Sequence, residues 1–185
     1  MSSQGKLGTI NCFVSKCPNK NFISQHMTNN RMIRELKDIV KLCKKWEAID
    51  FNEVMVRAAE NGHIEIVKLC KKWGATDFKW AMVRAAENGH IDIVKLCKEW
   101  GATDFDLAMT SAAVGGHIEI VKLCKEWGAT DFKLAMMFAA GEGHIEIVKM
   151  LMTPWTKSKT RDALEIAAAR GHIDIVKLLK EWRNL

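Results

Sequence analysis

The sequence predicts an all-α solenoid of stacked helix–turn–helix units. The first observation is a repeat: the segment 62–88 restarts almost unchanged at Gly89 and again at Gly116. The second is an apolar period typical of α-helices, and the third is a glycine where each helix is expected to end. Because each unit buries its apolar face only against its copies, the chain is expected to be elongated.

The N-terminal part does not follow the repeat. Residues 1–30 are rich in Asn, Ser and Lys, and we interpret them as an arm or irregular cap. Residues 31–50 align with the second half of a repeat, so we expect a half-repeat that covers one end of the array 31–185. Full repeats are expected to begin at about residues 51, 78, 105, 132 and 159.

One helix of each repeat is predicted from Ile64 to Trp73. Ile66, Leu69, Cys70 and Trp73 stand at i, i+3, i+4 and i+7 and form one apolar face. Glu65 and Lys68 lie on the opposite side, where they can form an ion pair. Such a pair contributes only about 0.2–0.5 kcal/mol, so the outer face supports the helix without implying a site.

The other helix is predicted from Lys79 to Glu87. Its apolar side consists of Ala81, Met82, Ala85 and Ala86, small or flexible side chains that let neighbouring helices approach closely. Thr76-Asp77 supplies an N-cap, Asn88-Gly89 ends this helix, and Gly74 or Gly101 ends the other.

The register changes once, in the segment MLMTPWTKS. Trp127 and Trp155 are 28 residues apart instead of 27, and Pro154 follows the apolar pattern directly. Since proline breaks or caps a helix, we expect a kink or loop at 153–160.

The net charge of +6 lies mainly at one end of the chain. Residues 1–50 hold nine Lys or Arg and four Asp or Glu, whereas residues 51–185 hold nineteen and eighteen. The repeats are therefore nearly neutral, which disfavours an extended nucleic-acid surface. The alternative that remains is nucleic-acid binding by the basic arm and first helix, which carry Arg31, Arg34, Lys37, Lys41, Lys44 and Lys45.

The chain carries no membrane-span pattern and no signal-peptide pattern. We therefore expect a cytoplasmic protein.

These repeats resemble ankyrin repeats. The segment GHIEIVKLCKKWGA at 62–75 is similar to the family pattern GHLEIVELLLKxGA. The segment WAMVRAAENGH at 80–90 is similar to the family pattern TPLHxAAxxGH, although TPLH itself is absent. The resemblance implies an ankyrin-like solenoid whose 27-residue unit leaves only a shortened hairpin loop. One helix leucine of the family is replaced by Lys71, Lys98 or Lys125. The Trp and Cys of each unit resemble compact repeats in proteins of large eukaryotic DNA viruses.

The cysteine and histidine ladders are interpreted as structural. Cys43, Cys70, Cys97 and Cys124 recur every 27 residues, but Leu151 and Leu179 take the equivalent places, which favours core packing. Each repeated His follows a helix-ending Gly and is expected to bond nearby backbone. These structural pairs are Gly62 and His63, Gly89 and His90, Gly116 and His117, Gly143 and His144, and Gly171 and His172.

The periodic aromatic residues are also expected to pack between repeats. Phe follows Asp in each loop and Trp ends each of the other helices, as at Phe78 and Trp100. Cys12, Cys17 and His26 form only a weak zinc candidate, because four ligands are needed. No catalytic motif is recognised, so we expect no enzyme activity, no cofactor and no metal.

The residues that differ between repeats are the better candidates for function. We compared the outward-facing residues, at positions i, i+4 and i+7, of the helix predicted from Lys79 to Glu87 and of its equivalents in the other repeats. These residues change from charged to apolar along the array. In ankyrin-like folds this helix lines the groove that binds partners, so the resemblance implies a protein-binding site. We assign it to Arg57, Trp80, Arg84, Leu107, Ser111, Leu134, Phe138 and Ile166.

The expected partner is a protein with an apolar segment next to acidic residues, bound by a monomeric, non-catalytic scaffold. Two other interpretations stay open: the stripe residues pack on neighbouring helices, or the array assembles end to end. Neither nucleic acid nor a membrane is the expected partner of the repeats.

Overall fold

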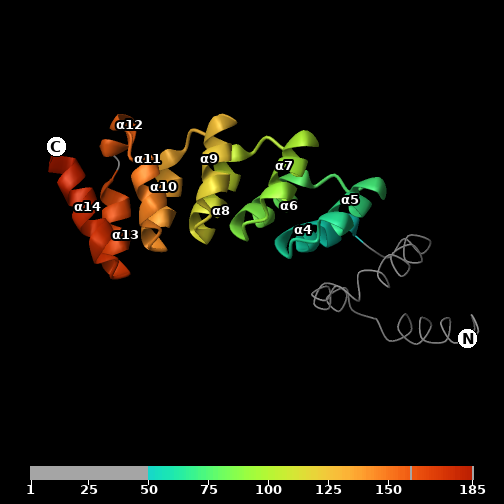
Figure 1. The fold of residues 1–185 in the computed structure, drawn as a ribbon, viewed down its shortest axis with the longest axis horizontal. Coiled ribbons are helices and arrows are strands. Elements are labelled where there is room, and N and C mark those ends of the chain that lie inside the picture. Colours follow the sequence, from blue (N-terminus) through green and yellow to red (C-terminus); the bar gives the residue numbers. More distant parts are fainter. Residues whose placement is uncertain (1–49, 159, 185) are drawn as a thin grey trace, which may run out of the picture.

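The computed structural model describes residues 50–158 and 160–184. This part of the chain is an array of helix pairs that stack side by side along one long axis (Figure 1). Eleven helices and no strand occur among the described residues. The predicted all-α helix–turn–helix solenoid with short loops is therefore confirmed.

The first helix of each repeat forms one row of the array. Neighbouring members of this row pack against each other, so that it forms a continuous layer. Its members are α4 (Phe51–Glu60), α6 (Phe78–Glu87), α8 (Phe105–Gly115), α10 (Phe132–Gly141) and α13 (Arg161–Ala169).

The second helix of each repeat packs against the first helix of the same repeat. These helices are α5 (Ile64–Lys72), α7 (Ile91–Glu99), α9 (Ile118–Glu126), α11 (Ile145–Leu151) and α14 (Ile173–Asn184). A further short helix, α12 (Pro154–Lys157), lies between α11 and α13.

The predicted helix boundaries follow from local capping. Asp77 is the N-cap of α6, where its side chain accepts a hydrogen bond from the Trp80 amide, as the sequence predicts. Asn88 ends the helix, and Gly89 has φ of 80°, a left-handed conformation that favours glycine. Gly74 adopts φ of 96° after α5, so both predicted terminators are confirmed.

The core forms between the two rows of helices. Ala and Met side chains of the first helices are fully buried against Ile, Val and Cys of the second helices. Cys97 is fully buried, as are Leu151 and Leu179 at the equivalent positions of the last two repeats. The interpretation of the repeated cysteines as core residues is thus confirmed for those that the structure describes.

The last repeat begins after the predicted break. The helix α11 ends at Leu151, and Pro154 is the first residue of α12, so a one-turn helix forms where we expected a kink or loop. The hydroxyl of Thr156 donates to the carbonyls of Leu151 and Thr153, at 3.0 and 2.9 Å. The bond to Leu151 satisfies a carbonyl at the end of α11, whereas Thr153 is the N-cap of α12.

The connections between repeats are held by the second residue of each first helix. Asn52 Oδ1 accepts hydrogen bonds from the amides of Thr76 and Asp77, at 2.8 and 2.9 Å. Asp106 Oδ1 accepts equivalent bonds from Thr130 and Asp131. The loop therefore needs no strand to satisfy its amides.

In the alternate repeats this position holds a lysine that forms an ion pair instead. Lys79 Nζ lies 2.9 Å from Asp104, and Lys133 Nζ lies 2.6 Å from Asp162. The hydrogen bond from Lys133 lowers the pKa of Asp162 and raises the pKa of Lys133.

Several predictions fall on residues 1–49, outside the described residues. They are the arm at 1–30, nearly all of the half-repeat at 31–50, the zinc candidate Cys12, Cys17 and His26, and the basic residues from Arg31 to Lys45.

Candidate functional site

The residues assigned to partner binding lie on the row of first helices. Arg57 belongs to α4, Trp80 and Arg84 to α6, Leu107 and Ser111 to α8, Leu134 and Phe138 to α10, and Ile166 to α13. These helices are neighbours in the array, so the structure brings the eight residues, which we call the stripe, onto one layer.

The stripe contains unusually exposed apolar side chains. Trp80 is 46% exposed, Leu134 36% and Phe138 38%, while Leu107 and Ile166 are half-buried. Of the five large apolar side chains that are exposed in the described residues, three belong to the stripe. Exposed apolar surface that is grouped in this way often marks an interaction site.

The stripe does not present unpaired positive charge. Arg57 Nη1 lies 3.2 Å from Glu60, and Arg84 Nη1 lies 2.7 Å from Glu87, in each case on the same helix. From the sequence we expected the two arginines to contact an acidic partner. The structure shows that each arginine already has a carboxylate beside it. A partner would have to compete with those carboxylates.

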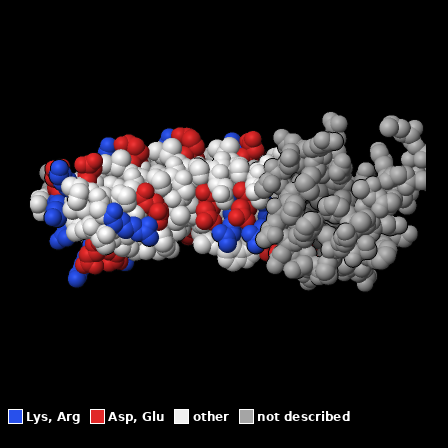
Figure 2. All heavy atoms as spheres, turned by 90° about the horizontal axis from the view of Figure 1, so that it is seen from below, with Lys and Arg blue, Asp and Glu red and all other residues white. Residues whose placement is uncertain are grey.

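The distribution of charge on one face of the molecule is seen in Figure 2. Blue and red side chains recur along the upper edge of this view, and below that edge the surface in the middle of the described array is mostly uncharged. Within the row of first helices, α8 carries one charged residue, Asp106, and α10 carries one, Lys133. The middle of the first-helix row is therefore its most apolar part.

The repeated histidines link consecutive repeats. His90 Nε2 lies 3.0 Å from the carbonyl oxygen of Glu60, and His117 Nε2 lies 3.0 Å from that of Glu87. Because a carbonyl only accepts, Nε2 carries the proton. We expected a bond to nearby backbone; the acceptor lies 30 residues earlier, in the preceding repeat.

The same bond recurs further along the array, from His144 to Val114 and from His172 to Gly141. Each ring also lies over the helix-ending glycine of the preceding repeat. A Cβ added to Gly89 would come within 2.6 Å of His117 Cε1, so this glycine provides space as well as its left-handed backbone.

The aromatic residues pack, as the sequence predicts. The ring centroids of Phe78 and Trp100 are 5.3 Å apart, and those of Phe105 and Trp127 are 5.5 Å apart. Trp155 differs because it lies on α12, where it is 85% exposed. The inserted residue and Pro154 thus remove one tryptophan from the packed series.

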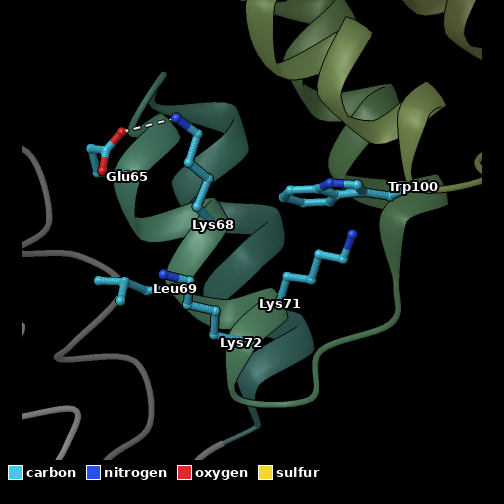
Figure 3. Close-up of a pocket in the computed structure, with 6 residues that line it drawn as sticks. All are labelled: Glu65, Lys68, Leu69, Lys71, Lys72 and Trp100. Atoms are coloured by element: carbon cyan, nitrogen blue, oxygen red, sulfur yellow. Dashed lines mark hydrogen bonds and ion pairs between the residues drawn. The ribbon is translucent and has the colours of Figure 1, made fainter.

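A surface hollow of about 560 Å³ lies between the second helices α5 and α7. It is lined by Glu65, Lys68, Leu69, Lys71, Lys72 and Trp100. Figure 3 shows Lys71 extending toward the indole of Trp100, and its Nζ lies 4.3 Å from the ring centroid. Lys68 turns away to pair with Glu65 at 3.1 Å.

Sequence reasoning missed this contact between lysine and tryptophan. Lys98 lies in the same way over Trp127, at 4.5 Å, so the contact recurs in the next repeat. The sequence did contain a signal for this contact. In each case a lysine replaces a leucine of the family pattern, and it lies one repeat before the tryptophan that it contacts. A cation over an indole contributes about 0.5–1 kcal/mol at an exposed site, which indicates a link between repeats.

The described residues contain no group of three or more metal-ligating side chains. Within this part of the chain, no helix is long and apolar enough to cross a membrane.

The fold and the stripe define a helical repeat scaffold. A family model described as ankyrin repeats (3 copies) matches residues 82–154 and 108–184, which together span more than half of the chain. This protein belongs to the ankyrin-repeat family. Ankyrin repeats are generally non-catalytic and mediate protein–protein interactions. No curated protein matches the chain.

Proposed function

We propose that this chain is a non-catalytic scaffold that binds a protein partner through the stripe. The observation that carries the proposal is the exposure of Trp80, Leu134 and Phe138 on a single layer of helices. Large apolar side chains at the centre of an interface supply most of its binding free energy, and arginine often accompanies them. Partner binding is the role that best uses these exposed residues.

The test compares two aspartate substitutions at exposed aromatic residues. Phe138→Asp places a charge in the stripe, whereas Trp155→Asp places one on α12, away from the stripe. Both tagged proteins are checked for unchanged helicity by circular dichroism, and the proteins recovered with each are quantified by mass spectrometry. Phe138→Asp should lose partners that the Trp155→Asp protein keeps. Identical recovery by all variants would overturn the assignment.

A viral origin is a further proposal. Its support is the sequence resemblance of the compact repeat, with Trp and Cys in each unit, to proteins of large eukaryotic DNA viruses. In that case the partner is a host factor in the cytoplasm, and the scaffold acts as a monomer. Detection of the chain only in infected cells, imaging of its location, and light scattering would test these three statements separately.

The alternative function is nucleic-acid association by the basic N-terminal part. Residues 1–50 carry nine Lys or Arg against four Asp or Glu, which is the observation that favours it. A mobility shift that weakens with salt and disappears on deletion of residues 1–45 would support this alternative. Absence of a shift at about 50 mM salt would exclude it, because phosphate contacts strengthen as the salt concentration falls.

A further inference from the structure

The first-helix row carries an excess of negative charge. Within the bounds of α4, α6, α8, α10 and α13 there are five Lys or Arg and six Asp or Glu, a net charge of −1. The N-cap residues Asp50, Asp77, Asp104 and Asp131 add four carboxylates, which brings the net charge to −5. The net charge of the whole chain is +6, so the net charge of this row has the opposite sign.

Every cation of this row has a carboxylate partner. The pairs are Arg57 with Glu60, Lys79 with Asp104, Arg84 with Glu87, Lys133 with Asp162, and Arg161 with Glu165. All five N···O distances lie between 2.6 and 3.2 Å. A bound acidic segment would therefore find no Lys or Arg of these helices without a partner.

Some carboxylates of the row have no such partner. Asp50, Glu53 and Asp106 are exposed, and none of them forms an ion pair with a Lys or Arg among the described residues. Glu53 occupies the position in α4 that Trp80 occupies in α6, so it lies in line with the stripe. Asp106 directly precedes the stripe residue Leu107, and its carboxylate accepts hydrogen bonds from the backbone amides of Thr130 and Asp131.

We infer that the stripe binds a protein segment that combines large apolar side chains with a net positive charge. This inference rests on the proposed function and deepens it. The apolar side chains contact Leu134, Phe138 and their neighbours, and the Lys or Arg side chains face the unpaired carboxylates. An acidic segment, the partner expected from sequence, would meet an excess of like charge, and complementary sign favours both encounter and specificity.

The experiment selects ligands without assuming a partner. A phage library of random peptides about 16 residues long is panned against the full-length chain at 50 mM NaCl. The expected peptides carry several Leu, Ile, Phe or Trp residues and more Lys and Arg than Asp and Glu. Phe138→Asp should weaken their binding by tenfold or more, while the matched Trp155→Asp variant should bind them unchanged.

The sign of the charge is then tested on one selected peptide. Its Lys and Arg residues are replaced by Gln in one version and by Glu in another, and affinity is measured by fluorescence anisotropy. At 50 mM NaCl we expect the Gln version to bind about threefold more weakly and the Glu version more weakly still. At 500 mM NaCl the three affinities should converge, because salt screens exposed charges.

A charge reversal in the protein supplies the matched control. Glu53→Lys should weaken binding of the original peptide about threefold. Glu126→Lys makes the same change at an exposed residue of the second helix α9, and it should have no effect.

The possible contrary results separate the two proposals. If the selected peptides are acidic, or if the Lys, Gln and Glu versions bind equally while Phe138→Asp still abolishes binding, the charge inference is wrong and the proposed function stands. If no selected peptide depends on Phe138, the proposed function fails together with the inference.

Discussion

From α7 onward, the histidine that precedes each second helix joins two repeats with one hydrogen bond. The acceptor carbonyls of Glu60 and Glu87 lie at the ends of first helices, where backbone carbonyls lack an intrahelical donor. The imidazole therefore satisfies a carbonyl that would otherwise be left unpaired in a partly buried place.

Replacement of His117 by Ala should lower the free energy of unfolding by about 1–3 kcal/mol. The Glu87 carbonyl would lose its donor, and the space over Gly89 would be left empty. Urea unfolding followed by circular dichroism measures the change. Lys122→Ala removes only an exposed ion pair with Glu119 and should cost about 0.5 kcal/mol or less. Equal effects of the two substitutions would contradict the role given to the histidine.

The buried cysteines are expected to stay protonated in the folded protein. Burial raises the pKa of the Cys97 thiol from 9.0 to about 12, and that of Cys70 and Cys124 also to about 12. A thiol with such a pKa is a poor nucleophile, because the thiolate is the reactive species.

The raised pKa values of the buried thiols predict that the free energy of unfolding falls at high pH. Below pH 9 the thiol is protonated in both states, but between pH 9 and about 12 it ionises only in the unfolded chain. Each buried thiol therefore lowers the free energy of unfolding by up to about 1.4 kcal/mol per pH unit in that window. Urea unfolding at pH 8 and pH 10 should show a smaller pH effect in Cys97→Ala than in the unsubstituted protein. The same pH effect in both proteins would exclude this contribution.

At the scale of the helices, two kinds of contact hold the loops between repeats. Asn52 and Asp106 bond the loop amides directly, whereas Lys79 and Lys133 form ion pairs across to the next repeat. The direct bonds replace part of the pairing that a hairpin would supply. The lysine pairs are exposed and should contribute less, since median surface ion pairs contribute about 0–1 kcal/mol.

Asp106→Ala should lower the free energy of unfolding by about 1–2 kcal/mol, because the amides of Thr130 and Asp131 lose their acceptor. Asp106→Asn keeps an oxygen in the same place, as Asn52 does in the first described repeat, and should cost less than about 0.5 kcal/mol. Thermal unfolding of the two variants measures the difference. The prediction would be wrong if Asn were as harmful as Ala.

At the scale of the whole molecule, the stacking of repeats determines how deeply a position is buried and how much it contributes to the free energy of unfolding. Ala140 is fully buried where α10 packs against α13, whereas the equivalent Ala168 of the last repeat is exposed. The two residues thus occupy equivalent repeat positions and differ in burial.

This difference predicts unequal effects of the same substitution. Ala140→Glu should destabilise the array by about 3 kcal/mol or more, because it buries an unpaired carboxylate and overfills the contact. Ala168→Glu should change the free energy of unfolding by about 0.5 kcal/mol or less. Both values come from urea unfolding, and similar losses at the two sites would refute the stacking shown in Figure 1.

The sequence by itself determined the helix pairs, their ends and the core positions. Apolar spacing, N-cap aspartates such as Asp77 and terminators such as Gly89 act within one turn of the chain, and repetition shows them several times. The same reasoning identified the stripe residues, because the places where repeats differ can be read by aligning them. Their role in partner binding stays a prediction.

Only the tertiary structure decided what each side chain meets in the neighbouring repeat. It placed the acceptor of His117 one repeat back, paired Arg84 with Glu87, and left Trp155 exposed on α12. These features depend on the separation of stacked helices and on the rotamers of long side chains. A local sequence pattern does not specify either quantity. For this reason the sequence suggested an acidic partner, whereas the ion pairs in the structure lead us to propose a basic one.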